Sequence, residues 1–257
     1  MPLRGLRLRC AAPLCFLAAI LPVAHATDAA LLLAPSRQRL ETADYRITGR
    51  LVTTDAKGTR SSASLVLKAH TFAGEFRLLV DVTAPASARQ HLLLTLRTDG
   101  HATIALARPG DKTVAALPFA RWSEGFLAGN FSYEDLLESQ VFWPEQTALP
   151  PARRGARDCN IVRSTPGTET RTHYTQATTW LDKTIGYPIF VEKLGTGGLA
   201  KEFTSIGLRH EQGVWSASQV EATVRGRSGS TLLIVDRGSA AAHLQPADFS
   251  PEAMLRF

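Results

Sequence analysis

The sequence predicts a mainly β protein with a few helices, built as a meander of antiparallel strands. Short segments in which apolar and polar residues alternate recur along most of the chain. Turn residues, mainly Gly and Asp, separate many of these segments. No repeat of roughly 20 to 50 residues and no low-complexity linker divides the chain, which indicates a single domain.

The first 26 residues have the composition of a secretory signal peptide. Three arginines precede an apolar stretch at residues 10–23, and a small-x-small cleavage site ends at Ala26. A retained membrane anchor is the alternative, but two prolines interrupt the apolar stretch, which is shorter than the roughly 20 residues of a spanning helix. We therefore expect cleavage after Ala26 and an exported mature domain of residues 27–257.

Charge and cysteine content narrow the function further. Loss of the signal peptide would lower the formal net charge from +6 to +3, because three arginines leave with it. No run of lysine or arginine suggests a surface that follows phosphates, so nucleic acid is not an expected partner. Cys159 would be the only remaining cysteine, and we expect it to be a small buried apolar residue with no disulfide partner.

The first elements after the signal peptide follow from local patterns. Residues 29–33 can form a short helix, and alternation over residues 45–51 predicts a strand with one buried face. A hairpin turn at residues 55–58 leads into the next strand. The predicted strands of this half cover residues 45–51, 64–69, 75–82, 91–96 and 102–107.

Two predicted strands are apolar on both faces. Residues 92–96 contain four leucines, and residues 232–235 read Leu-Leu-Ile-Val. Such a strand must be covered on both sides, either by protein alone or by protein on one side and an apolar ligand on the other. The pattern leaves both possibilities open.

Residues 117–157 differ in composition from the predicted strands on either side, because they contain several prolines and glycines that argue against regular strands. Within them, Ser132 can cap a helix that starts at Tyr133, because Asp135 stands three residues after the cap and acidic groups favour the positive end of the helix dipole. We expect this helix to cover the sheet.

Strand patterns resume after Asp158 and continue almost to the end of the chain. Ser250-Pro251-Glu252 then predicts a final helical turn. The predicted strands of this half cover residues 160–164, 170–181, 189–194, 200–205, 214–224 and 231–236.

No constellation for catalysis, metal binding or phosphate binding emerges from the sequence. The chain lacks a Gly-x-Ser-x-Gly elbow and a His-x-x-x-His pair. The glycine-rich segment 195–198 precedes a strand and so lacks the helix N-terminus that holds phosphate. Glu134 and Asp135 are adjacent on a predicted helix and do not face each other, so capping explains them better than acid-base chemistry. We expect neither an enzyme nor a cofactor.

Several segments, in order, resemble the outer-membrane lipoprotein-sorting (LolA-like) family. The most specific is Gly129-Asn130-Phe131-Ser132-Tyr133-Glu134-Asp135-Leu136, which is similar to the Gly-x-x-Phe-Ser-Tyr-x-Asp-Leu signature of a broad branch of that family. The resemblance covers most of the mature chain. Its other segments are Cys159, Tyr174, Thr179-Trp180-Leu181-Asp182-Lys183, Pro188, Lys201, Phe203, Trp215, Gly229-Ser230-Thr231-Leu232-Leu233 and Pro246-x-x-Phe249-Ser250.

The resemblance implies a strongly curved antiparallel sheet, an unclosed half-barrel, with a few helices covering its concave face and a hydrophobic cavity between them. The implied function is a periplasmic carrier or chaperone that shields the acyl chains of a lipoprotein or another lipid during transport across the cell envelope. Its implied partners are this cargo, an inner-membrane exporter that loads it, and a membrane surface contacted transiently.

Candidate residues for such a site follow from apolarity and predicted placement, with ordinary core as the alternative role for each. A periplasmic sensor or regulatory adaptor with the same fold, and a structural envelope adaptor, are the alternative functions. Phe131, Tyr133 and Asp135 are the candidates for anchoring the covering helix. The candidates for the cavity are Leu94, Leu96, Ile104, Phe126, Phe131, Trp143 and Trp180.

Overall fold

The computed structural model describes residues 28–211 and 213–257, and in these residues the chain is mainly β. The alternating segments form one antiparallel sheet of 13 strands. The predicted signal peptide lies outside the described residues. The strands are β1 (Asp44–Thr54), β2 (Arg60–Phe72), β3 (Glu75–Ala84), β4 (Gln90–Arg97), β5 (Ala102–Ala107), β6 (Ala115–Ala116), β7 (Glu145–Arg154), β8 (Arg157–Thr165), β9 (Tyr174–Asp182), β10 (Pro188–Gly195), β11 (Ala200–Glu211), β12 (Val214–Val224) and β13 (Ser230–Ser239).

Helices in the described residues are few and mostly short. The α-helices are α1 (Ala29–Glu41) and α2 (Pro251–Met254). The 3-10 helices are η1 (Ala86–Ala88), η2 (Phe119–Arg121), η3 (Phe126–Ala128), η4 (Tyr133–Leu136), η5 (Ser139–Phe142) and η6 (Pro246–Phe249).

The strand order is β6-β5-β4-β3-β2-β1-β13-β12-β11-β10-β9-β8-β7. The first and last strands of the chain therefore pair in the middle of the sheet and join two meanders, while β6 and β7 are its two edges. Because these edges are consecutive in the chain but lie at opposite sides, residues 117–144 must cross the sheet to connect them. We call this stretch the covering segment.

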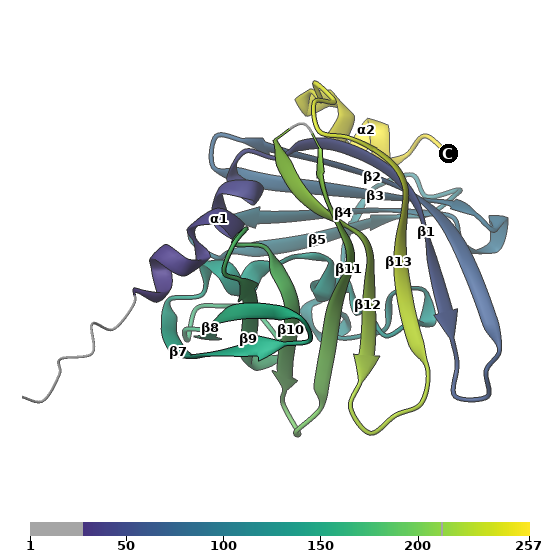
Figure 1. Cartoon of the computed structure of the whole chain (residues 1–257). Coiled ribbons are helices and arrows are strands. Elements are labelled where there is room, and N and C mark those ends of the chain that lie inside the picture. Colours follow the sequence, from purple (N-terminus) through teal and green to yellow (C-terminus); the bar gives the residue numbers. More distant parts are fainter. Residues whose placement is uncertain (1–27, 212) are drawn as a thin grey trace, which may run out of the picture.

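The prediction of an antiparallel, mainly β sheet is confirmed, but strong curvature is not observed. The sheet is neither closed nor strongly curled. Its strands do change direction, since β2–β5 run across the view in Figure 1 whereas β11–β13 run down it, as expected from accumulated twist. Side chains of the covering segment pack on the sheet between its two edges.

Several elements differ from the sequence prediction in their bounds. The first helix extends past residue 33 to Glu41 although Pro35 lies inside it. Residue Leu31, whose carbonyl loses its helical donor at Pro35, is 71% exposed, so water can solvate that carbonyl. The predicted strand at 170–181 begins only at Tyr174.

Strand β7 was not predicted, because its two prolines argue against a strand interior. Its register shifts between Leu149 and Ala152, where Pro150 and Pro151 lie, and the strand is at the sheet edge. An edge strand tolerates proline because one side of it needs no ladder hydrogen bonds.

Both faces of the sheet carry buried side chains. We call the face that bears Leu65, Leu94, Leu181 and Phe203 the inner face, because their side chains belong to the main hydrophobic core with α1 and the covering segment. The C-terminal residues 244–257 cover β3–β5 on the other, outer face. Figure 1 shows α1 beside β7 and β8, and α2 at the opposite end near β2 and β3.

Candidate functional site

The inner face of β1–β5 is almost entirely aliphatic. Leucine, valine, isoleucine and alanine side chains from these five strands are buried against α1 and the covering segment. Leu33 and Leu40 contribute from α1, and Phe126, Leu137 and Val141 contribute from the covering segment. The two-sided apolar strand at residues 92–96 is thus covered by protein on both faces, since Leu93 on its outer face packs with the C-terminal segment.

Five of the seven predicted cavity residues lie in this core. The structure brings together Leu94, Leu96, Ile104, Phe126 and Phe131, each at most 4% exposed. Their side chains contact protein neighbours, and neither of the two pockets described below includes them.

The two predicted tryptophans lie elsewhere. Trp143 is buried in a separate small cluster with Tyr174 and Ala177. Trp180 follows Thr179 and precedes Leu181 on β9, and because Leu181 is in the inner core, Trp180 points to the outer face. There it packs edge-on against Phe190. Apolarity and predicted placement suggested that Trp180 lines the cavity, but in the structure it lies on the other side of the sheet from Leu181.

One pocket opens onto the inner face between the β1–β2 hairpin and the covering segment, with a volume of about 250 Å³. Leu127, at its rim, and the adjacent Ala128 have φ of 51° and 57°, a left-handed conformation that costs non-glycine residues of the order of 1–3 kcal/mol. A second pocket of about 260 Å³ lies between α1 and the turns that precede β10 and β12. The first pocket is lined by Leu51, Thr53, Ser61, Ser62, Ala63, Pro85, Ala88 and Leu127.

The Gly129–Leu136 signature fixes the covering segment to the middle of the sheet. A Cβ on Gly129 would lie 2.9 Å from Oγ1 of Thr231, so only glycine approaches β13 this closely. The Asn130 amide N–H donates to Thr231 Oγ1 at 2.8 Å, and its side-chain amide donates to the carbonyls of Ala222 and Gly229 at 3.2 and 3.3 Å.

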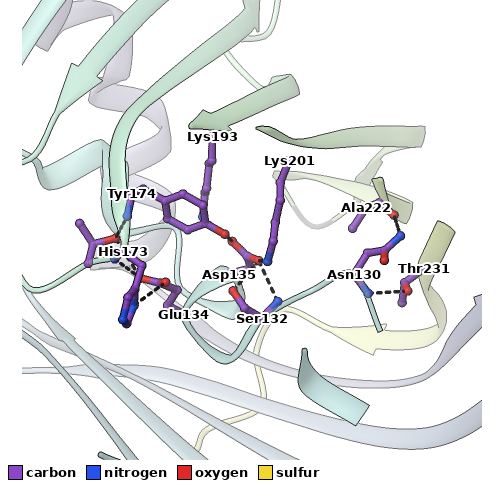
Figure 2. A network of polar contacts seen from close by, with 11 residues as sticks. Asn130, Ser132, Glu134, Asp135, His173, Tyr174, Lys193, Lys201, Ala222 and Thr231 are labelled. Atoms are coloured by element: carbon purple, nitrogen blue, oxygen red, sulfur yellow. Dashed lines mark hydrogen bonds and ion pairs between the residues drawn. The ribbon is translucent and has the colours of Figure 1, made fainter. Parts of the chain in front are cut away.

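The same signature continues to a buried ion-pair network on β9–β11, shown in Figure 2. The Asp135 carboxylate accepts from the Tyr174 hydroxyl at 2.7 Å, from Lys201 Nζ at 2.8 Å and from Lys193 Nζ at 3.3 Å. The Ser132 amide and hydroxyl donate to it at 2.8 and 2.7 Å. All three charged side chains are at most 8% exposed.

This environment decides the charge of Asp135. Burial alone would raise the pKa of its carboxyl, but the ammonium groups of Lys193 and Lys201 and the hydrogen bonds from Lys201 and Ser132 outweigh burial and hold that pKa well below its usual range. Burial and the neighbouring Asp135 charge raise the pKa of Tyr174. The carboxylate is therefore ionised at neutral pH and the phenol is a hydrogen-bond donor.

Glu134, the neighbour of Asp135, attaches the covering segment to a different strand end. Its carboxylate accepts from the Thr172 hydroxyl at 2.9 Å and from the His173 amide at 3.1 Å, and it lies 3.1 Å from His173 Nδ1. Figure 2 shows this contact on one side of Asp135 and the Asn130–Thr231 contact on the other. The signature thus spans the inner face from β13 to β9.

The helix predicted at Ser132 is a single 3-10 turn, η4, capped by Ser132 and Asp135. Phe131 packs against Phe203 on β11, with ring centroids 5.6 Å apart, and Tyr133 packs edge-on against Phe126. The candidate anchoring residues Phe131, Tyr133 and Asp135 therefore lie together between the covering segment and the sheet.

Sequence reasoning overlooked Lys193 as a site residue. Its signal lay in hairpin geometry, because the turn at residues 195–198 pairs Lys193 with Lys201 across β10 and β11. Lys193 also alternates in phase with Val191, a residue of the inner core. The strand period and the hairpin register together could have predicted the lysine pair, but not the contact with Asp135.

Other kinds of site are not evident in residues 28–211 and 213–257. No three His, Cys, Asp or Glu side chains of this part come together as potential metal ligands. Within the same residues, no helix combines the length and apolarity needed to cross a bilayer. Cys159 is buried and forms no disulfide with another described residue.

Comparison with known proteins places the fold. A family model described as an uncharacterized protein matches residues 74–256. A search of curated protein sequences finds no match. Solved structures of similar fold include an outer membrane lipoprotein-sorting protein domain from Vibrio parahaemolyticus, which is 22% identical with a TM-score of 0.78 over 87% of this chain and 98% of that one.

Two further structures show the same fold. A DUF1329 family protein from Desulfovibrio piger is 15% identical with a TM-score of 0.79, over 88% of this chain and 97% of that one. A LolA superfamily protein from Nitrosomonas europaea is 14% identical with a TM-score of 0.70, over 89% of this chain and 100% of that one.

Proposed function

This chain belongs to the family of uncharacterized proteins matched over residues 74–256 and has the fold of the LolA superfamily, and from this premise we propose that it is a periplasmic carrier for acyl chains. The carrier receives a lipoprotein or another lipid, shields its chains between the inner face and the covering segment, and releases them at an acceptor. The proposal assigns it no catalytic step and no cofactor.

The observation that supports this function is the continuous aliphatic inner face beneath a covering segment that contains no long helix or strand, only short 3-10 helices. Each methylene that leaves water contributes about 0.8 kcal/mol, so one long chain gains many kcal/mol on this face. The covering segment is attached by side-chain bonds at Asn130, Glu134 and Asp135. Such bonds can break and re-form, which suits a cover that must open and close.

Loading requires movement of the covering segment. The open pocket of about 250 Å³ is below the roughly 300–1,000 Å³ of typical ligand sites. We assign the hinge to Leu127 and Ala128, because their left-handed backbone is strained and they line the pocket mouth or adjoin it. On opening, Leu94, Leu96, Ile104, Phe126 and Phe131 would line the site, with Phe131, Tyr133 and Asp135 fixing the closed position.

Location and partners complete the proposal. A signal peptide over residues 1–26 would direct residues 27–257 to the periplasm as one domain. There an inner-membrane exporter would load the carrier, and contact with a membrane surface would be transient. These assignments rest on the N-terminal sequence and on the fold shared with the lipoprotein-sorting domain from Vibrio.

The test is mass spectrometry of organic extracts from protein purified out of the periplasm without detergent. We expect an acyl lipid in a stoichiometric amount, and its mass names the cargo class. A protein that is empty and also fails to take up a fluorescent fatty acid would contradict the carrier function and favour a structural adaptor.

A further inference from the structure

One row of inner-face side chains crosses β8–β11 and places two positive charges side by side. Ser164 pairs with Ala177, Ala177 with Lys193, and Lys193 with Lys201. Like charges directly opposite each other on neighbouring strands destabilise a sheet. Both lysines are nevertheless buried, so this row needs negative charge to be stable.

The hydrogen-bond donors at this row outnumber the acceptor positions of Asp135, the carboxylate that they surround. Asp135 receives five donor contacts, from Tyr174, Lys193, Lys201 and twice from Ser132, whereas a carboxylate offers about four lone-pair positions. Within the described part of the chain, Asp135 is the only carboxylate in ion-pair contact with either lysine. Two buried ammonium groups therefore share one carboxylate, and the remaining neighbours of Lys193 Nζ include the rings of Tyr174 and Phe203, 5.1 and 5.2 Å from their centroids.

Two further polar groups beside the row lack an acceptor or donor. The Trp143 indole N–H and the Ser164 hydroxyl are buried and have no hydrogen-bond partner among the described residues. Trp143 packs on Tyr174 and Ala177, which places it next to the lysine pair. A buried group left without its partner destabilises a protein, so an ion-pair network alone does not explain why these groups are here.

We propose that this row is the head-group site for an anionic lipid, and that Asp135 is an internal anion which the lipid's phosphate displaces. This inference rests on the proposed carrier function and adds the chemical class of its cargo. The non-bridging oxygens of a phosphodiester accept from Lys193, Lys201 and Tyr174, and Trp143 and Ser164 lie within the same site. The acyl chains then extend past Phe203 toward the aliphatic inner face of β1–β5.

Displacement links cargo binding to opening of the cover. When the phosphate binds Lys193 and Lys201, Asp135 loses its counter-ions. Asp135 and the turn η4 then move away from the sheet. The rest of the covering segment follows about the hinge at Leu127. A lipid without a phosphate, such as diacylglycerol, offers the lysines no substitute for Asp135, so the protein discriminates between lipids by the anion of the head group.

The experiment offers the purified protein mixed vesicles of phosphatidylcholine, phosphatidylglycerol and diacylglycerol with identical acyl chains. After the vesicles are removed, mass spectrometry counts each bound lipid relative to its vesicle content. We expect enrichment of phosphatidylglycerol over diacylglycerol by about tenfold or more, as two charge-assisted hydrogen bonds give. Added glycerol phosphate should not reduce this uptake. If it competed fully, the ligand of the site would be a free phosphate compound and not a lipid head group.

Lys193→Gln is the decisive variant because it keeps the one-to-one pair of Asp135 with Lys201 and removes only the surplus charge. We expect it to bind acyl lipid and to lose most of the preference for phosphatidylglycerol. Lys112→Gln, at an exposed loop position, is the matched control and should keep that preference. An unchanged preference in Lys193→Gln would overturn the inference and leave the carrier function standing.

A measurement on the unmodified protein does not depend on how the variant folds. Hydrogen exchange of residues 130–137 should rise at least severalfold when phosphatidylglycerol is bound and should change little with diacylglycerol. Equal protection in both complexes would overturn the displacement of Asp135. Failure of the protein to take up any of the three lipids would instead contradict the proposed function itself.

Discussion

The two halves of the inner face hold the same covering segment in different ways. Strands β1–β5 present aliphatic side chains such as Leu65 and Leu94, whereas β8–β11 present Ser164, Lys193 and Lys201 among fewer apolar residues. Apolar burial is strong but non-directional, and hydrogen bonds and ion pairs fix distance and angle. The aliphatic half thus supplies most of the stabilisation, and the polar half determines where the segment sits.

We expect the largest loss of stability when the negative charge of Asp135 is removed from the polar half. Asp135→Asn leaves two buried lysines without a counter-ion, and we expect it to lower the free energy of unfolding by about 3–5 kcal/mol. Urea denaturation measures this change. The control is Asp236→Asn, whose partner Arg50 is exposed and whose loss should cost about 0–1 kcal/mol. Equal costs for the two variants would show that the network does not hold the segment.

The aliphatic half is tested by Leu94→Ala. Leu94 is fully buried on β4, and the cavity left by its side chain should lower the free energy of unfolding by about 2–5 kcal/mol. Leu31→Ala, at a residue 71% exposed on α1, should change it by about 0.5 kcal/mol or less. If Leu94→Ala cost as little as Leu31→Ala, neighbouring side chains would be refilling the space, and the core would be more plastic than the packing indicates.

Acid should weaken the polar half selectively. The pKa of Asp135 is lower in the folded protein than the unfolded value of about 3.9, so its contribution to stability is complete above that value and is lost as pH falls toward the folded pKa. The loss is at most about 1.4 kcal/mol per pH unit. The difference in unfolding free energy between wild type and Asp135→Asn should therefore narrow between pH 5 and pH 2.5, as urea titrations at each pH would measure. A constant difference would mean that Asp135 does not titrate with folding.

The smallest effect is expected at the point where the two halves meet. Asn130→Ala removes two hydrogen bonds to the carbonyls of Ala222 and Gly229, and we expect a loss of about 1 kcal/mol. Hydrogen exchange should locate the change in residues 125–137 and leave β2–β4 protected as in the wild type. Faster exchange throughout the sheet would show instead that Asn130 supports the sheet as a whole.

Most strands were predictable because their signal is local. Alternation with a period of two, or a short apolar run between turn residues, identified every long strand except β7. The capping pattern at Ser132 and Asp135 identified the position of η4. Signals of this kind need only neighbours in the chain. The grouping of Leu94, Leu96 and Ile104 in one core also follows from strand periodicity.

What the sequence by itself determined is the mainly antiparallel sheet, its apolar strands and the importance of the Gly129–Leu136 signature. Only the tertiary structure decided that β7 is an edge where two prolines are tolerated, that the sheet stays open and weakly curled, and that Trp180 faces outward. It also brought Asp135 to Lys193 and Lys201. The physical reason is that these outcomes depend on strand order, and β6 and β7 lie at opposite edges only because β1 pairs with β13. That one long-range pairing sends the covering segment across the inner face and its carboxylate to the two lysines.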